Sequence, residues 1–245
     1  MTIIHKELSY TVRGVLIDVH NQLGPMLPEK FVQDAVMVGL EAEGIRCEAE
    51  KEFEVTYRGV GAGRYFVDVW VEGGKQLLEL KVVPELLPIH RAQAISYLKV
   101  TGADLAVLAN FGQERLVDER LPNFLDKKTV EFSWMPEPSL MHLAHAEFLN
   151  EVLEVLHFVH FQLRPGFFHR VYRNAVMIEL RHRGIGYRYI HHIPVYYRGH
   201  HLGEQVTRLL CVEDVALVAA VAVQGLTEGM KKAFRVRLAQ LGLEV

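Results

Sequence analysis

The sequence has few cysteines and no long apolar run. Only two of its 245 residues are cysteine, Cys47 and Cys211, and their spacing matches no zinc-binding motif. Such scarcity is typical of a protein in a reducing compartment, so we expect a cytoplasmic location. No stretch of 18 or more apolar residues is present, and we expect no transmembrane helix. The first residues lack the apolar segment of a signal peptide.

The sequence also lacks a strong net charge. Its formal charge of −3 argues against a generally basic nucleic-acid-binding surface. The charge is uneven, however: residues 1–139 hold 15 basic and 21 acidic side chains, whereas residues 140–245 hold 12 and 9. Ten of those twelve basic residues are arginine. This asymmetry predicts different roles for the two halves of the chain.

The strongest strand signal lies in residues 65–83. Two runs of β-branched and aromatic residues flank Gly73-Gly74, and this pattern predicts a β-hairpin. Three charged side chains interrupt the apolar runs. Asp68 lies on the first strand, and Glu79 and Lys81 share one face of the second because side chains alternate along a strand.

Charged groups on so apolar a hairpin are costly unless they are paired or bind a metal. Two interpretations are therefore open. Lys81 forms a structural ion pair with the two carboxylates, or Asp68, Glu79 and the carbonyl of Leu80 bind Mg²⁺ or Mn²⁺, which prefer oxygen ligands. In the second case a lysine beside the ion would position water or offset phosphate charge.

The surrounding periodicity predicts helices over residues 8–23, 28–43 and 88–100 and strands over 48–57 and 104–111. Glutamates alternate through residues 48–54, and we interpret them as a solvated face rather than a site. The order of helices and strands favours an α+β fold, with helices packed on a mostly antiparallel mixed sheet.

Five blocks of this region carry a specific resemblance: His20–Ala35, Phe53–Gly59, Glu79–Lys81, His90–Leu98 and Leu108–Gly112. Together with Asp68 they resemble the GxxExxY family, a branch of the PD-(D/E)xK nuclease-like proteins, over about residues 5–112. Met26 and Val32 stand where that family has its name-giving glycine and tyrosine.

The resemblance implies a role for each matching residue. It implies Asp68 and Glu79 as metal ligands, Lys81 as the catalytic lysine and Glu29 as an accessory acid. Two further residues, Gln93 and Tyr97, would be helper groups that face the site. The implied activity is Mg²⁺- or Mn²⁺-dependent cleavage of nucleic acid, with DNA favoured over RNA.

The second half of the chain repeats the first. Adding 140 to each number aligns the halves without a gap, and Tyr57-Arg58-Gly59, for example, matches Tyr197-Arg198-Gly199. This predicts a tandem duplication. We expect a first lobe at residues 1–112, a connector at 113–147 with one strand at 129–134, and a second lobe at 148–245. The two lobes would form an intramolecular pseudo-dimer.

The second copy lacks the chemistry. At this offset Glu29, Asp68, Glu79, Lys81, Gln93 and Tyr97 become His169, Arg208, Ala219, Val221, Ala233 and Arg237. We expect a degenerate lobe without a metal, in which Arg208 and Arg237 contact nucleic-acid phosphates. The alternative is that its arginines form a scattered, solvated surface. Histidine pairs such as His157 and His160 give only a weak zinc signal without a cysteine or carboxylate.

The sequence thus predicts a metal-dependent nuclease-like phosphodiesterase that acts through its first lobe. The alternative is a catalytically inactive module that uses the same fold to bind nucleic acid or a protein partner. A purely structural duplication is the third possibility.

Overall fold

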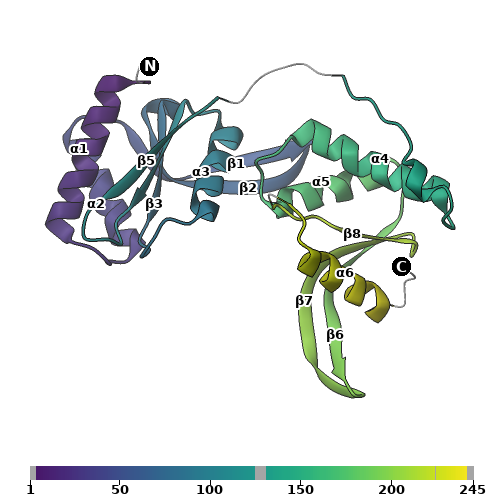
Figure 1. Ribbon diagram of the computed structural model, residues 1–245. Helices are drawn as coiled ribbons and strands as arrows, with labels where there is room; N and C mark the ends of the chain where they lie inside the picture. The colour runs from purple at the N-terminus through teal and green to yellow at the C-terminus, as the bar shows by residue number, and fades with distance from the viewer. Residues whose placement is uncertain (1–3, 125–130, 224, 242–245) are drawn as a thin grey trace. The chain divides into compact units, whose positions relative to one another are not determined.

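The computed structural model describes residues 4–124, 131–223 and 225–241, which form two compact units (Figure 1). Unit 1 comprises Met1–Val55 and Gly63–Thr129. Unit 2 comprises Thr56–Ala62 and Val130–Val245. No helix within the described ranges is long and apolar enough to cross a membrane.

Unit 1 has three helices and a mixed five-stranded sheet. The helices are α1 (Lys6–Leu23), α2 (Glu29–Ala42) and α3 (Pro88–Thr101). The sheet has the order β1-β2-β3-β4-β5, with strands β1 (Cys47–Tyr57), β2 (Val60–Val71), β3 (Gln76–Lys81), β4 (Leu105–Asn110) and β5 (Val117–Pro122). Strands β3 and β4 are parallel, whereas β2–β3 and β4–β5 are antiparallel. The predicted α+β class is confirmed.

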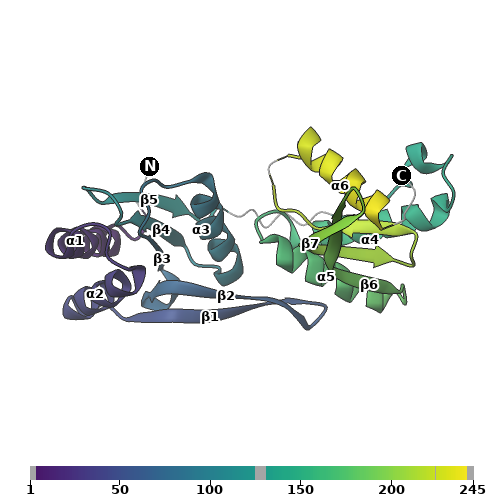
Figure 2. The same cartoon turned by 90° about the horizontal axis from the view of Figure 1, so that it is seen from below.

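Helices cover both faces of this sheet, with α1 and α2 on one face and α3 on the other (Figure 2). Apolar residues of α1 and α2, such as Leu16 and Val36, form one core with Val69, Leu78 and Leu80 of the sheet. Because side chains alternate, the neighbours Asp68, Glu79 and Lys81 lie on the face that α3 covers. The same alternation that buries the leucines therefore gathers the charged groups.

Strand β5 lies inside the stretch that the sequence analysis predicts to be a connector, residues 113–147. It pairs with β4 in antiparallel fashion: Val117 lies opposite Asn110, and Pro122 lies opposite Leu105. The sheet of unit 1 therefore extends past the predicted boundary at residue 112. Its middle residues are charged because it is an edge strand: Asp118 pairs with Arg13 and Glu119 with Arg91. Of the strand predicted at 129–134, residues 129 and 130 lie outside the described residues, and 131–134 form no strand.

Unit 2 repeats the order of the elements from α1 to α3, and none of its described strands corresponds to β4 or β5. It contains α4 (Ala146–Leu163), α5 (His169–His182), β6 (Tyr187–Tyr197), β7 (His200–Val212), β8 (Ala216–Ala219) and α6 (Glu228–Gln240). The first three begin and end 140 residues after α1, α2 and β1. The described strands of this unit form one sheet of order β6-β7-β8.

The pairing of β7 corrects one predicted equivalence. In unit 1, Val69 pairs with Leu78, and one further step along the antiparallel register places Asp68 opposite Glu79. In unit 2 the residue opposite Ala219 is Leu209, not Arg208. A register shift between Ile190 and His192 adds a residue to β7, so Arg208 lies in a β-bulge. The gap-free alignment is therefore wrong at Asp68.

The turn residues Thr56–Ala62 belong to unit 2, where they contact α5. The carboxylate of Glu179 is fully buried and accepts hydrogen bonds from Tyr57 Oη at 2.9 Å, from Arg58 and from Arg183. These donors lower the pKa of Glu179 to about 2 although burial alone would raise it. This buried charge is structural, because its hydrogen-bonding capacity is used within the unit.

Candidate functional site

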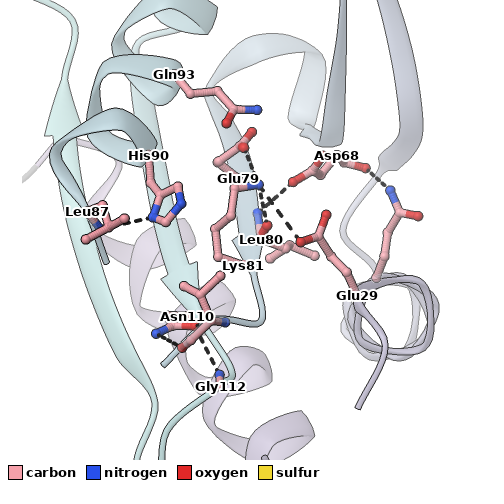
Figure 3. Close-up of polar contacts among 12 residues, drawn as sticks. Glu29, Asp68, Glu79, Leu80, Lys81, Leu87, His90, Gln93, Asn110 and Gly112 are labelled. Atoms are coloured by element: carbon pink, nitrogen blue, oxygen red, sulfur yellow. Dashed lines mark hydrogen bonds and ion pairs between the residues drawn. The ribbon is translucent and has the colours of Figure 1, made fainter. Parts of the chain in front are cut away.

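Asp68 stands where β2 separates from β3. Beyond this point β2 continues back to Val60 without β3 beside it, so the N–H of Leu80 has no strand partner there. The Asp68 carboxylate replaces that partner and accepts a hydrogen bond from Leu80 N at 2.7 Å (Figure 3). From α2, Gln33 donates to the main-chain oxygen of Asp68 at 2.8 Å. The separation of β2 from β3 thus leaves a main-chain N–H that holds the Asp68 carboxylate, one of the predicted metal ligands, against β3.

Glu79 lies in the middle of β3 and its side chain is fully buried. Its Oε1 forms an ion pair with Lys81, whose Nζ lies 2.5 Å away. Its Oε2 has no hydrogen-bond partner among the described residues. A buried carboxylate with a single polar contact is costly, and a bound cation would stabilise it.

Lys81 Nζ connects three of the predicted site residues. It donates to the carbonyl of Leu80 at 2.8 Å, pairs with Glu79, and lies 4.0 Å from Glu29 Oε2 (Figure 3). The first two contacts are to predicted metal ligands. The ammonium group is therefore held by the same oxygen atoms that the sequence assigns to a metal ion.

Three carboxylates face one lysine, so the cluster carries excess negative charge. Burial raises the pKa of Asp68 to about 6. Burial and the neighbouring Asp68 raise the pKa of Glu79 to about 8. Burial alone would lower the pKa of Lys81, but Glu79, Asp68 and Glu29 outweigh it and raise that pKa. Asp68, Glu79 and Lys81 thus have raised pKa values, as expected for buried groups in a site that is short of positive charge.

The predicted helper groups come from α3. Gln93 Nε2 donates to Tyr97 Oη at 3.1 Å, and Figure 3 shows Gln93 directed toward Glu79. Tyr97 is buried, and burial followed by the charge of Glu79 raises its pKa. Both residues lie beside the carboxylate cluster. The resemblance to the GxxExxY family was the signal that found them.

The structure adds Glu50, which the sequence analysis interprets as part of a solvated face. Glu50 has a positive φ of 48° within β1, an unusual backbone conformation that interrupts the alternation. Its Oε1 accepts a hydrogen bond from Gln33 at 2.8 Å. A cavity of 160 Å³ is lined by Glu29, Lys30, Gln33, Glu50, Asp68 and Leu80. This space is large enough for several water molecules beside the site.

Asn110 fixes the end of β3 next to the site. Its Oδ1 accepts from the N–H groups of Val83 and Gly112, and its Nδ2 donates to the carbonyl of Val83. At Gly112 a Cβ atom would lie 2.2 Å from the Val83 carbonyl oxygen, so only glycine fits. The β3 and β4 ends are thereby joined immediately after Lys81.

The donor set fits Mg²⁺ or Mn²⁺. It consists of oxygen atoms only, includes the buried Glu79 Oε2, which has no hydrogen-bond partner, and lies in a cluster with excess negative charge. Within the described ranges, no three His, Cys, Asp or Glu side chains form a ready-made metal cluster. The fit therefore rests on two carboxylates supplemented by the Leu80 carbonyl.

The predicted phosphate contacts of unit 2 are not brought together by any described interaction. Arg208 donates toward His169 Nε2 at 2.9 Å. Arg237 lies on α6 and lines a separate cavity with Val195, Gln205, Gly229, Lys232, Ala233, Val236 and Gln240. The two arginines thus have different surroundings.

Comparison with known proteins agrees with this geometry. The family model for the PD-(D/E)XK nuclease superfamily matches residues 6–121 and again 146–244. The chain therefore belongs to the PD-(D/E)XK nuclease superfamily. The two matched regions are consistent with two lobes, and the first includes most of β5.

A search of the curated proteins found no match. Among solved structures, the chain is similar to one titled "Crystal structure of SSO0001", with 19% sequence identity and a TM-score of 0.34. That alignment covers 40% of this chain and 52% of the other, so this chain spans about half of that protein.

Proposed function

We propose that unit 1 is a Mg²⁺-dependent phosphodiesterase that cleaves nucleic acid, with DNA favoured over RNA. The observation that carries this proposal is the buried carboxylate of Glu79, which lies beside Asp68, pairs with Lys81 through Oε1 and has no hydrogen-bond partner at Oε2. Superfamily membership supports the reaction class. It does not by itself identify the substrate.

Each residue has a distinct part in the proposed reaction. Asp68, Glu79 and the Leu80 carbonyl hold the metal, whose chemistry would be to polarise a phosphoryl oxygen and lower the pKa of water. Lys81 orients the attacking water and offsets charge on the phosphate. Glu29, 47% exposed, lies on the open side of the cluster and acts as an accessory acid. Gln93 and Tyr97 act as helper groups that face the site from α3.

We also propose that the chain arose by tandem duplication. Unit 2 would be a degenerate duplicate of unit 1, because the ends of α4, α5 and β6 repeat those of α1, α2 and β1 at a constant offset. The match to the GxxExxY blocks remains the basis for assigning unit 1 to that branch. An intramolecular pseudo-dimer is part of the same proposal.

A cleavage assay tests the activity. Purified protein is incubated with single- and double-stranded DNA and RNA, with Mg²⁺, with Mn²⁺ or with a chelator. Cleavage is expected only with the divalent ions, and Lys81→Ala is expected to abolish it while circular dichroism shows an intact fold. Equal cleavage by wild type and Lys81→Ala would refute the assignment of Lys81.

The second candidate is an inactive module that binds nucleic acid or a protein partner. It is favoured by the contacts of Lys81, whose ammonium already satisfies the Leu80 carbonyl and pairs with Glu79. Calorimetric titration with Mn²⁺ separates the two. A catalytic site predicts binding by wild type that Asp68→Asn weakens strongly, whereas the inactive module predicts no binding by either.

A further inference from the structure

The N-terminal end of α5 in unit 2 carries an unusual concentration of positive charge. His169 and Arg170 open the helix and Arg173 follows one turn later, while Arg208 reaches it from the β7 bulge. At the matching helix positions, unit 1 has Glu29 and Gln33 in place of His169 and Arg173. The change replaces one acid and one amide by two groups that bind anions.

Arg173 is the central observation. Its residue is only 9% exposed, yet its Nε and Nη1 atoms are buried without a hydrogen-bond partner. The guanidinium stacks over the ring of Tyr189 at 5.4 Å, which orients it but does not satisfy its N–H groups. Burial and the nearby Arg208 lower its pKa. A buried cation with unused donors is costly unless an anion completes it.

His169 connects the two arginines. Arg208 Nη1 lies 2.9 Å from His169 Nε2, so a neutral imidazole accepts the hydrogen bond and holds Arg208 in place. Burial, then Arg173, Arg208 and Arg170, lower the pKa of His169, and this keeps the imidazole neutral. Among the described residues, no carboxylate pairs with Arg173 or Arg208.

We propose that His169, Arg173 and Arg208 form a binding site for a phosphate group. Two guanidinium groups offer paired N–H donors to a tetrahedral oxyanion, and they lie at the N-terminal end of a 14-residue helix, whose dipole favours an anion. A phosphate balances more of this positive charge than a single carboxylate does. That the phosphate belongs to a nucleic-acid backbone rests on the function proposed for unit 1, whereas phosphate binding itself does not.

The test uses the full chain without divalent metal. Thermal unfolding is followed in potassium phosphate and in potassium chloride at equal ionic strength. The site predicts a higher Tm of the wild type in phosphate and an inorganic phosphate affinity that Arg208→Gln weakens by roughly tenfold. Arg181→Gln, an exposed arginine of the same helix, is the matched control and should respond like the wild type.

Arg173→Met gives a second, sharper outcome. This variant should lose the Tm increase in phosphate. Its Tm in chloride should not fall, because the substitution removes a buried cation whose Nε and Nη1 have no hydrogen-bond partner without phosphate. If that variant does not fold, the exposed Arg208→Gln still decides. Equal Tm in phosphate and chloride for the wild type, or an undiminished response in Arg208→Gln, overturns the proposal.

A competition experiment distinguishes the source of the phosphate. A DNA oligonucleotide with hydroxyl ends that displaces inorganic phosphate identifies a backbone site, and failure to displace it identifies a site for free phosphate or a nucleotide. Both results keep the phosphate site. Glu79→Gln should leave phosphate binding unchanged, so failure of the nuclease proposal is distinguishable from failure of this one.

Discussion

Unit 1 and unit 2 share the order of their elements from the first helix to the third, but the sheet face beneath the third helix differs between them. In unit 1 that face carries Asp68 and Glu79. In unit 2 the paired positions are Leu209 and Ala219, which pack in an apolar cluster with Phe234 of α6. The fold therefore does not need charge at this place, and the charge in unit 1 calls for another explanation.

The second difference lies at the N-terminal end of the second helix of each unit, α2 in unit 1 and α5 in unit 2. α2 presents Glu29 and Gln33 toward Asp68, whereas α5 presents His169 and Arg173 toward Arg208. One helix end therefore contributes to an acidic site and the other to a basic one. The comparison teaches that the scaffold fixes where polar groups gather, while a few side chains decide whether the ligand is a cation or an anion.

The largest effect is expected from removing the charge that distinguishes the two sheets. Glu79→Gln should reduce metal-dependent cleavage by roughly 100-fold or more, because a buried metal ligand loses its charge. Initial rates on labelled DNA measure this. Glu54→Gln, an exposed glutamate of β1, is the control and should cleave normally. Comparable rates for Glu79→Gln and wild type would remove the functional difference between the units.

A large effect on stability, not activity, is expected from the buried acid of unit 2. Glu179→Ala should lower the free energy of unfolding by about 3 kcal/mol, because Arg58 and Arg183 would lose their buried partner. Urea unfolding followed by circular dichroism measures it. Glu204→Ala, which removes a half-exposed pair with His201, should cost no more than about 0.5 kcal/mol. Similar losses in both variants would contradict the structural role of Glu179.

A moderate effect is expected from pH on the metal-free protein. The folded chain holds protons on Asp68 and Glu79 up to about pH 6 and about pH 8, above the ordinary values of 3.8 and 4.5. Folding therefore binds protons in this window, so stability should fall as the pH rises from 5 to 8.

Thermal unfolding in a chelator across this range measures the effect. Glu79→Gln should flatten the curve, and added Mn²⁺ should stabilise the wild type more at pH 8 than at pH 5, because metal binding requires the deprotonated carboxylates. A wild-type curve that rises from pH 5 to 8 without metal would show that Glu79 is not held in its protonated form.

The smallest effect is expected at Glu50. Glu50→Gln keeps an oxygen for Gln33 but removes a negative charge beside the site, so Mn²⁺ affinity should fall by up to about tenfold. Calorimetry measures it, with Glu52→Gln on the same strand as the control. An unchanged Mn²⁺ affinity would show that Glu50 is only part of the solvated face that the sequence predicts and does not contribute to the site.

The sequence predicted most of the helices and strands because their apolar periodicity is regular. Helices α1, α2 and α3 and strands β1 to β4 lie within a few residues of the expected ranges. Strand β5 was missed because its residues are charged and their partners, Arg13 and Arg91, lie on distant helices. Glu50 is exposed, as the sequence predicts, but its hydrogen bond with Gln33 and its place at the cavity depend on α2 lying beside β1, which the local pattern does not show.

The equivalence of Asp68 with Arg208 failed for a similar reason. A bulge adds one residue to β7, and the following turn is one residue shorter than in unit 1. The total length is unchanged, so an alignment with a constant offset of 140 does not reveal the extra residue. The conclusion that unit 2 lacks the acidic set survives, because Leu209 carries no charge either.

By itself, the amino-acid sequence determined the α+β class, the repeated order of elements, and the identity of Asp68, Glu79 and Lys81 as unusual charges on an apolar hairpin. These features follow from local periodicity and from the cost of burying charge. Both can be recognised from residues that are close together in the sequence. Only the tertiary structure decided that Glu79 is buried with Lys81 as its partner, that Glu50 lines the cavity beside Asp68, and that Arg173 has buried N–H groups without hydrogen bonds. Such facts depend on the packing of segments far apart in the chain.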